Sequence, residues 1–236
     1  MVPIEAGKIL RDFMTWGVLF PYGSGDYSPE AAQFVDYEEK LEHHFNEVLT
    51  DEERSKYDNW VVKFQSRTGE KYFSKDAVFE DFEKPTQLVL PRTPKNLASL
   101  FFVVHGFTVV DVPLKEIIER LEPSTHQFWS VDVQLPRSKK PVKDYFFMVI
   151  GQHFDAFLPE KSVEGAWIRA GAYFSAARSG KKHCNGLAVS EKVIVGAHLW
   201  RDEKLDMPRI FISDEFKSEI DRAGLRIPKH YKLIEA

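Results

Sequence analysis

The alternation of apolar and polar residues predicts a strand pair in the middle of the chain. HQFWSVDVQL, residues 126–135, puts Trp129 and three further apolar residues on one side and polar residues on the other, as a half-exposed strand does. DYFFMVIG, residues 144–151, is continuously apolar in its middle and indicates a central strand covered on both faces. The link between them is basic and contains two prolines. We therefore expect an antiparallel hairpin with an exposed loop.

Two other stretches share one pattern, an apolar strand that runs directly into an amphipathic helix. FTVVDVPLKEIIERL covers residues 107–121, and RIFISDEFKSEIDRAGL covers residues 209–225. Asp111 and Ser213 stand at the same position of the two units, where a side-chain oxygen can accept from the free amides of the first helical turn. The apolar residues expected to face the sheet are Leu114, Ile117 and Leu121 in the first helix and Phe216, Ile220 and Ala223 in the second.

Further elements follow from the same periodicities. Ser28-Pro29 indicates a helix start, and apolar residues at three- and four-residue steps predict a helix to about Leu49. These apolar residues are Phe34, Tyr37, Leu41, Phe45 and Val48. Strands are predicted at 59–64, 87–90, 192–200, 209–213 and 230–235. Residues 151–190 have no clean period, and we expect them to be mostly loop with some helix.

The order of these elements predicts an α+β fold, with a mixed, largely antiparallel sheet and helices packed on it. PRTPKN, residues 91–96, is the candidate domain boundary. It would separate an N-terminal helix-and-strand portion, 1–90, from a C-terminal α+β domain, 91–236. One continuous domain is the alternative.

Charge is unevenly distributed. The whole chain carries −4, but eleven acids against three bases give −8 between Asp26 and Asp58, which leaves +4 elsewhere. The acids of the predicted helix and the turn after it are Glu38, Glu39, Glu42, Glu47, Asp51, Glu52 and Glu53. A solvated helix face explains most such runs. The alternative is a surface that binds a basic partner.

Composition and cysteine content indicate a cytoplasmic globular protein. Residues are 43% hydrophobic and 29% charged, which is ordinary for such proteins. Cys184 is the single cysteine, so the chain has neither an internal disulfide nor enough thiolates for a structural zinc site. No uncharged apolar run is long enough to span a membrane. We expect a cytoplasmic location and no membrane partner.

Recognisable catalytic, metal and nucleic-acid motifs are missing from the sequence. Cys184 adjoins His183 and precedes His198, but no nucleophile motif surrounds them. His43-His44 lacks metalloprotease spacing, and no cofactor is expected. Two basic patches lack the interleaved aromatic residues of a single-strand groove, so direct nucleic-acid binding is not expected. They comprise Arg137, Lys139, Lys140 and Lys143, and Arg178, Lys181 and Lys182.

The order of features over residues 85–227 resembles a known family. The segments that carry the likeness are 88–133, 144–162 and 198–225, the last being HLWRDEKLDMPRIFISDEFKSEIDRAGL. They are similar to the immunity proteins of bacterial polymorphic-toxin systems, specifically the eleventh immunity family, which also carries an uncharacterised-domain name. After Leu225 the chain has RIPKHYKLIEA where the family has a glycine and a short Phe-containing strand. The resemblance implies a non-catalytic protein that binds and neutralises a cognate toxin.

Three functions are therefore weighed. The first is an immunity protein whose acidic segment, from Glu38 to Glu53, docks a basic toxin domain, with a nuclease as the expected partner because nucleases must hold phosphates. The second is a small-molecule enzyme with an unrecognised site around Cys184, His198 and Arg201. The third is an interaction domain of some other assembly.

Overall fold

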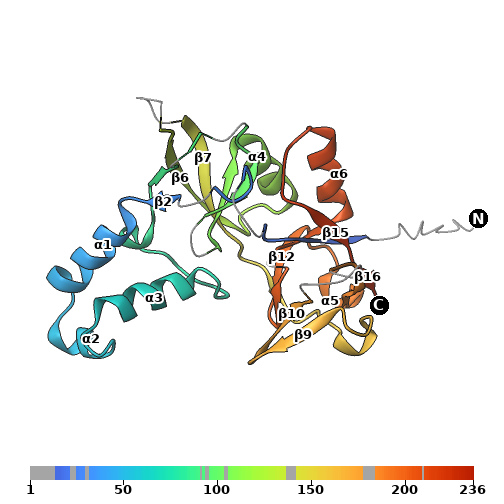
Figure 1. Ribbon diagram of the computed structural model, residues 1–236, viewed down its shortest axis with the longest axis horizontal. Coiled ribbons are helices and arrows are strands. Elements are labelled where there is room, and N and C mark those ends of the chain that lie inside the picture. Colours follow the sequence, from blue (N-terminus) through green and yellow to red (C-terminus); the bar gives the residue numbers. More distant parts are fainter. Residues whose placement is uncertain are drawn as a thin grey trace, which may run out of the picture.

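The computed structural model describes residues 14–21, 25–29, 32–90, 92–93, 96–103, 106–136, 142–177, 184–208 and 210–236. Two main sheets lie side by side, each with its own covering helix, and a helical segment extends from one flank as an arm (Figure 1). Most strand pairs are antiparallel, whereas β3 with β6, β8 with β12, β10 with β13 and β11 with β16 are parallel. The predicted α+β fold with a mixed, largely antiparallel sheet is confirmed.

The first sheet has six strands in the order β2-β3-β6-β7-β5-β4. Their bounds are β2 Gln33–Phe34, β3 Gln87–Val89, β4 Leu100–Phe102, β5 Thr108–Asp111, β6 Gln127–Gln134 and β7 Val142–Val149. The strands β6 and β7 form the predicted antiparallel hairpin, with Trp129 opposite Phe147. The arm lies on one face of this sheet and α4, Val112–Leu121, on the other.

The second sheet has five strands in the order β15-β1-β14-β12-β8. Their bounds are β1 Thr15–Val18, β8 His153–Phe154, β12 Leu199–Asp202, β14 Ile210–Ser213 and β15 His230–Lys232. Helix α6, Asp214–Arg222, covers it and packs beside α4.

Shorter elements complete the fold. A three-stranded sheet contains β9 Trp167–Ala170, β10 Tyr173–Ala176 and β13 Leu205–Met207. A two-stranded sheet joins β11 Ala188–Val189 to β16 Ile234–Glu235. The short helices are η2 Asp81–Glu83, η4 Pro159–Lys161, η5 Cys184–Gly186 and α5 Glu191–Ile194.

The arm consists of four helical segments. They are α1 Tyr37–His43, the π-helical η1 His44–Val48, α2 Asp51–Ser55 and α3 Val61–Lys71. Tyr72, fully buried just after α3, fixes the arm to the first sheet. Its hydroxyl donates to the Met148 carbonyl at 2.5 Å and accepts from the Thr108 amide at 2.8 Å. This hydroxyl bridges two paired residues of β5 and β7 and holds the end of α3 in a set place.

Alternation along the central strands builds three core layers. Successive side chains of a strand point to opposite faces. On the first sheet, Phe147 joins an aromatic layer beneath the arm, and Met148 joins a layer shared by α4 and α6. On the second sheet, Ile212 joins that same shared layer, whereas Phe211 joins a third layer against β9 and β10. The shared layer unites the two sheets into one packed body.

Both strand–cap–helix units form as predicted. The Asp111 carboxylate accepts from the Leu114 amide at 3.0 Å, and the Ser213 hydroxyl oxygen accepts from the Phe216 amide at 3.1 Å. The predicted inward residues of both helices are buried except that Leu121 is half-buried and Ala223 is exposed.

Two N-terminal assignments were wrong. The helix predicted from Pro29 begins at Tyr37, because Phe34 lies on β2, where it is buried against the first sheet. Val48 is 57% exposed and does not belong to the apolar face of the helix. The stretch 59–64, predicted as a strand, enters helix α3, which buries Phe64 and Thr68 at a helical four-residue spacing.

Two C-terminal assignments also needed correction. Residues 192–200 contain α5 and the start of β12 instead of one strand. Residues 151–190, expected to be mostly loop, contain β8, β9, β10 and β11. The first sheet combines β2 and β3 with strands that follow residue 91. The division into 1–90 and 91–236 stays a prediction.

Candidate functional site

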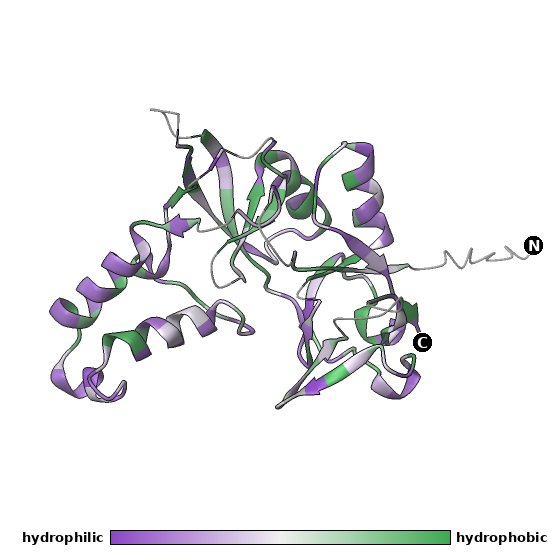
Figure 2. Ribbon diagram, in the orientation of Figure 1, coloured by the Kyte–Doolittle hydropathy of each residue, from purple (hydrophilic) through white to green (hydrophobic). Residues whose placement is uncertain are grey.

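The acidic residues singled out in the sequence all lie on the arm. Glu38, Glu39 and Glu42 belong to α1, Glu47 to η1, and Asp51, Glu52 and Glu53 to α2. All are exposed except Glu53, which is half-buried. Figure 2 shows hydrophilic residues dominating α1 and α2. The fold therefore gathers the predicted residues on one projecting element.

Local interactions explain the one half-buried member. The Glu53 carboxylate accepts from the Thr50 amide at 2.9 Å, and the Thr50 hydroxyl oxygen accepts from the Glu53 amide. This capping box starts α2. Asp51 pairs with Arg54 at 2.6 Å. Within the described residues, the carboxylates of Glu38, Glu39, Glu42, Glu47 and Glu52 form no ion pair, so their charge faces solvent.

A half-buried carboxylate, that of Asp36, anchors this acidic helix to the first sheet. Asp36 precedes α1 and accepts hydrogen bonds from Lys40, from the Thr86 hydroxyl at 2.6 Å and from the Gln87 amide at 3.1 Å. Burial alone would raise the pKa of Asp36, but these hydrogen bonds outweigh it and leave the pKa lowered. Asp36 therefore stays ionised and ties the arm to β3.

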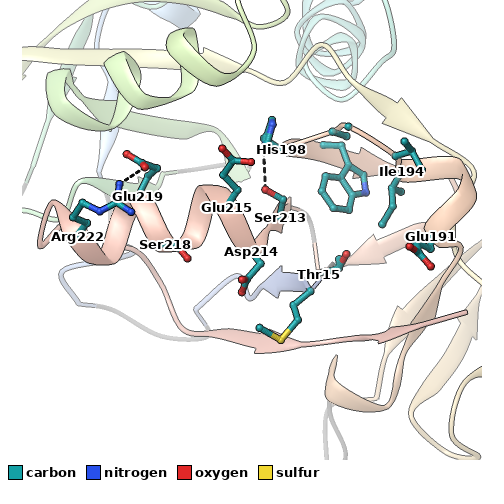
Figure 3. A pocket seen from close by; sticks show the side chains of 15 residues that line it. Thr15, Glu191, Ile194, His198, Ser213, Asp214, Glu215, Ser218, Glu219 and Arg222 are labelled. Carbon is teal, nitrogen blue, oxygen red and sulfur yellow. Dashed lines mark hydrogen bonds and ion pairs between the residues drawn. The ribbon is translucent and has the colours of Figure 1, made fainter. Parts of the chain in front are cut away.

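A cavity of 470 Å³ opens between the start of β1, the α5 segment and the first turns of α6. His198 and Ser213 face each other in it, with Nδ1 of the ring 2.9 Å from the serine hydroxyl oxygen (Figure 3). Asp214, Glu215 and Glu219 also line it. The Ser213 oxygen is the N-cap of α6, and His198 Nε2 contacts no described side chain that would orient the ring. A serine nucleophile requires such an oriented base.

The residues of the enzyme hypothesis do not converge as far as the structure describes them. His198 and Trp200 line the cavity beside α6, whereas Arg201 lines a different cavity beside α3. Trp200 and Arg201 are neighbours on β12, so strand alternation places their side chains on opposite faces of the sheet. Arg201 is buried, with its guanidinium 4.7 Å from the Phe73 ring. Cys184 begins η5, and its side chain and His183 lie outside the described residues.

A buried polar cluster that the sequence did not reveal joins the two main sheets. Glu122, at the end of α4, lies 2.6 Å from His126 and accepts from Gln152 at 2.6 Å. It also accepts from the backbone amides of His198 and Leu199, at the start of β12. Burial would raise the pKa of Glu122, but the bonds from His126 and these donors lower it overall. The four-residue spacing of Glu122 and His126 is the one local signal of this cluster.

Three further histidines of the described part, His44, His153 and His230, have structural partners. His44 stacks on Phe82 with ring centroids 3.5 Å apart, and His153 lies 3.2 Å from the Ile150 carbonyl. In the described part of the chain, no group of three or more His, Cys, Asp or Glu side chains is placed to hold a metal ion. His105 and most of the two basic patches lie outside the described residues.

The comparisons with known proteins identify the family. The model of an immunity protein family, Imm11, matches residues 36–232, which include the arm and every strand of the two main sheets except β1 and β2. The chain therefore belongs to the Imm11 immunity protein family. No curated protein matches it. Among the described residues, no helix combines the length and apolar character needed to cross a bilayer.

Proposed function

We propose that this protein binds a cognate toxin in the cytoplasm of the producing cell and neutralises it without chemical change. Membership of an immunity family carries the proposal, since such a family implies a toxin as partner. In this view the chain belongs to a polymorphic-toxin system used in competition between bacteria. Inhibition arises because the bound protein covers the surface that the toxin needs.

The acidic arm indicates which kind of toxin would bind. Its solvent-facing carboxylates, Glu38 to Glu53, form a negative surface on a projecting element. Such a surface speeds association with a basic partner and disfavours acidic ones. Toxins that cut nucleic acids carry basic surfaces because they hold phosphates, so a nuclease is the partner we propose.

Growth protection separates this proposal from the enzyme alternative. The toxin encoded beside the gene is expressed in cells together with the wild-type chain or with a variant that carries Cys184→Ala and His198→Ala. Survival equal to that with the wild-type chain is expected, because neither side chain is needed for covering a surface. Loss of protection by a variant that keeps its circular dichroism spectrum would favour an enzyme.

A further inference from the structure

A concave surface lies along α3, on the arm. A cavity of 420 Å³ between α1 and α3 and a second of 790 Å³ between the end of α3 and strands β10, β12 and β13 share the lining residues Glu70 and Phe73. The two cavities therefore adjoin. We call them together the α3 groove. Its walls come from the arm, from β12 of the second sheet and from β10 and β13 of the three-stranded sheet.

The floor of the groove is held in place by packing. Tyr72 is fixed by its two bonds to the first sheet, and Phe73 beside it is half-buried. The guanidinium of Arg201 lies 5.3 Å from the Tyr72 ring and 4.7 Å from the Phe73 ring, which adds cation–π attraction. A preformed floor of this kind lowers the ordering cost that a partner must overcome on binding.

The solvent-facing charge of the groove is negative. Its exposed carboxylates are Glu38, Glu70, Glu203 and Asp206. Among its described lining residues, Lys75 is the one exposed cation, and it lies 3.5 Å from Glu203. Burial, reinforced by the nearby Arg201 charge, lowers the pKa of His153, so this ring is uncharged at neutral pH. The groove thus offers a negative rim to a partner.

Each of the two cavities has an exposed apolar or aromatic side chain in its lining. Val62 on α3 is 67% exposed, and Tyr173 on β10 is 56% exposed. Tyrosine is enriched among the residues that dominate binding energy at interfaces, where apolar anchors sit within a polar rim. Val62 and Tyr173 occupy that position here.

We propose that the α3 groove receives a cationic segment of the toxin that carries an apolar side chain. This inference rests on the proposed function and names the surface that performs it. Lysine or arginine residues of the toxin would meet Glu70 and the rim, and its apolar residue would pack on Tyr173. The Lys75–Glu203 pair is exposed to solvent and therefore weak, so a toxin guanidinium can replace Lys75 at little cost. The acidic residues of the arm that lie outside the groove would attract the toxin, and the groove would hold it.

Binding of groove variants tests this assignment. The full chain is immobilised, and the dissociation constant is measured by biolayer interferometry for the toxin domain encoded beside the gene, inactivated by substitution. Glu70→Lys and Tyr173→Ala should each raise the dissociation constant about tenfold or more, as central interface residues do. Glu116→Lys on α4 and Val195→Ala, both exposed and outside the groove, are the matched controls and should change it less than about twofold.

The outcomes separate the two proposals. If the wild-type chain binds the toxin and the groove variants have dissociation constants within about twofold of it, the groove assignment is wrong and the proposed function still stands. Absence of wild-type binding overturns both. Circular dichroism of each variant confirms that an exposed substitution has left the fold intact.

Discussion

Single residues decide how the two sheets hold together, and Glu122 is the most consequential of them. Its carboxylate contacts His126 just before β6, and it accepts from Gln152 just before β8 and from two backbone amides at the start of β12. Removing a buried carboxylate leaves these donors unpaired, and each unpaired buried group costs about 1–3 kcal/mol. One buried carboxylate thus joins the two main sheets.

Glu122→Ala should lower the free energy of unfolding by about 3 kcal/mol, which urea denaturation at neutral pH measures. Glu119→Ala, on the exposed side of the same helix, is the control, because its surface pair with Lys115 is worth about 0–1 kcal/mol. Equal effects of the two substitutions would contradict the role of the cluster.

The same carboxylate gives stability a predictable pH dependence. The pKa of Glu122 is lowered from 4.5 in the folded state, so its contribution is full above about pH 4.5 and is lost as pH falls through the folded pKa. The stability difference between wild type and Glu122→Gln should therefore be largest at neutral pH and should narrow as the pH falls below 4.5 and through the lowered folded-state pKa. Urea midpoints at several pH values give this difference, and a difference that stays constant with pH argues against the assignment.

At the scale of elements, the two strand–cap–helix units are the clearest local devices. Asp111→Ala and Ser213→Ala should each lower the free energy of unfolding by about 1 kcal/mol, the ordinary cost of a lost N-cap. Ser218→Ala, at an exposed position within α6, should change it by less than about 0.5 kcal/mol. Thermal and urea unfolding provide the comparison. If Ser213→Ala were no worse than Ser218→Ala, the cap would not matter.

These units could be predicted because their signals are local. A capping side chain and an apolar period lie within a few residues of each other in both. The start of α3 shows the limit. The short apolar run around Val61 indicates a strand, but Trp60 and Val62 in it are exposed. The buried residues Phe64 and Thr68 are four apart, which is the helical spacing, and this is visible only over a longer window.

The strands of 151–190 and the α3 groove could not be read from the sequence for a related reason. Ile168 on β9 and Tyr173 on β10 are exposed apolar residues, so neither strand alternates cleanly between apolar and polar. The groove brings Glu70 on α3 beside Tyr173, and no local spacing links elements so distant in the chain. The acidic arm was visible because its charges follow one another.

For the molecule as a whole, we expect the acidic residues of the arm to attract the toxin and the α3 groove to hold it. A variant carrying Glu39→Gln, Glu42→Gln and Glu47→Gln, all outside the groove, should slow association with the toxin about tenfold at low salt and leave dissociation nearly unchanged. Raising the ionic strength should erase most of that difference. Stopped-flow association rates measure it, with Glu116→Gln as the control. An unchanged association rate would show that the charges of the arm do not speed association with the toxin.

We propose that the protein inhibits its partner by covering it and leaves the partner chemically unaltered. The most direct measurement is a titration of purified toxin domain with the purified full chain, following toxin activity and the mass of the species by light scattering. Toxin activity should disappear at an equimolar ratio, together with the appearance of a complex of one copy of each. Inactivation by a small fraction of an equivalent, with no complex formed, would contradict this proposal.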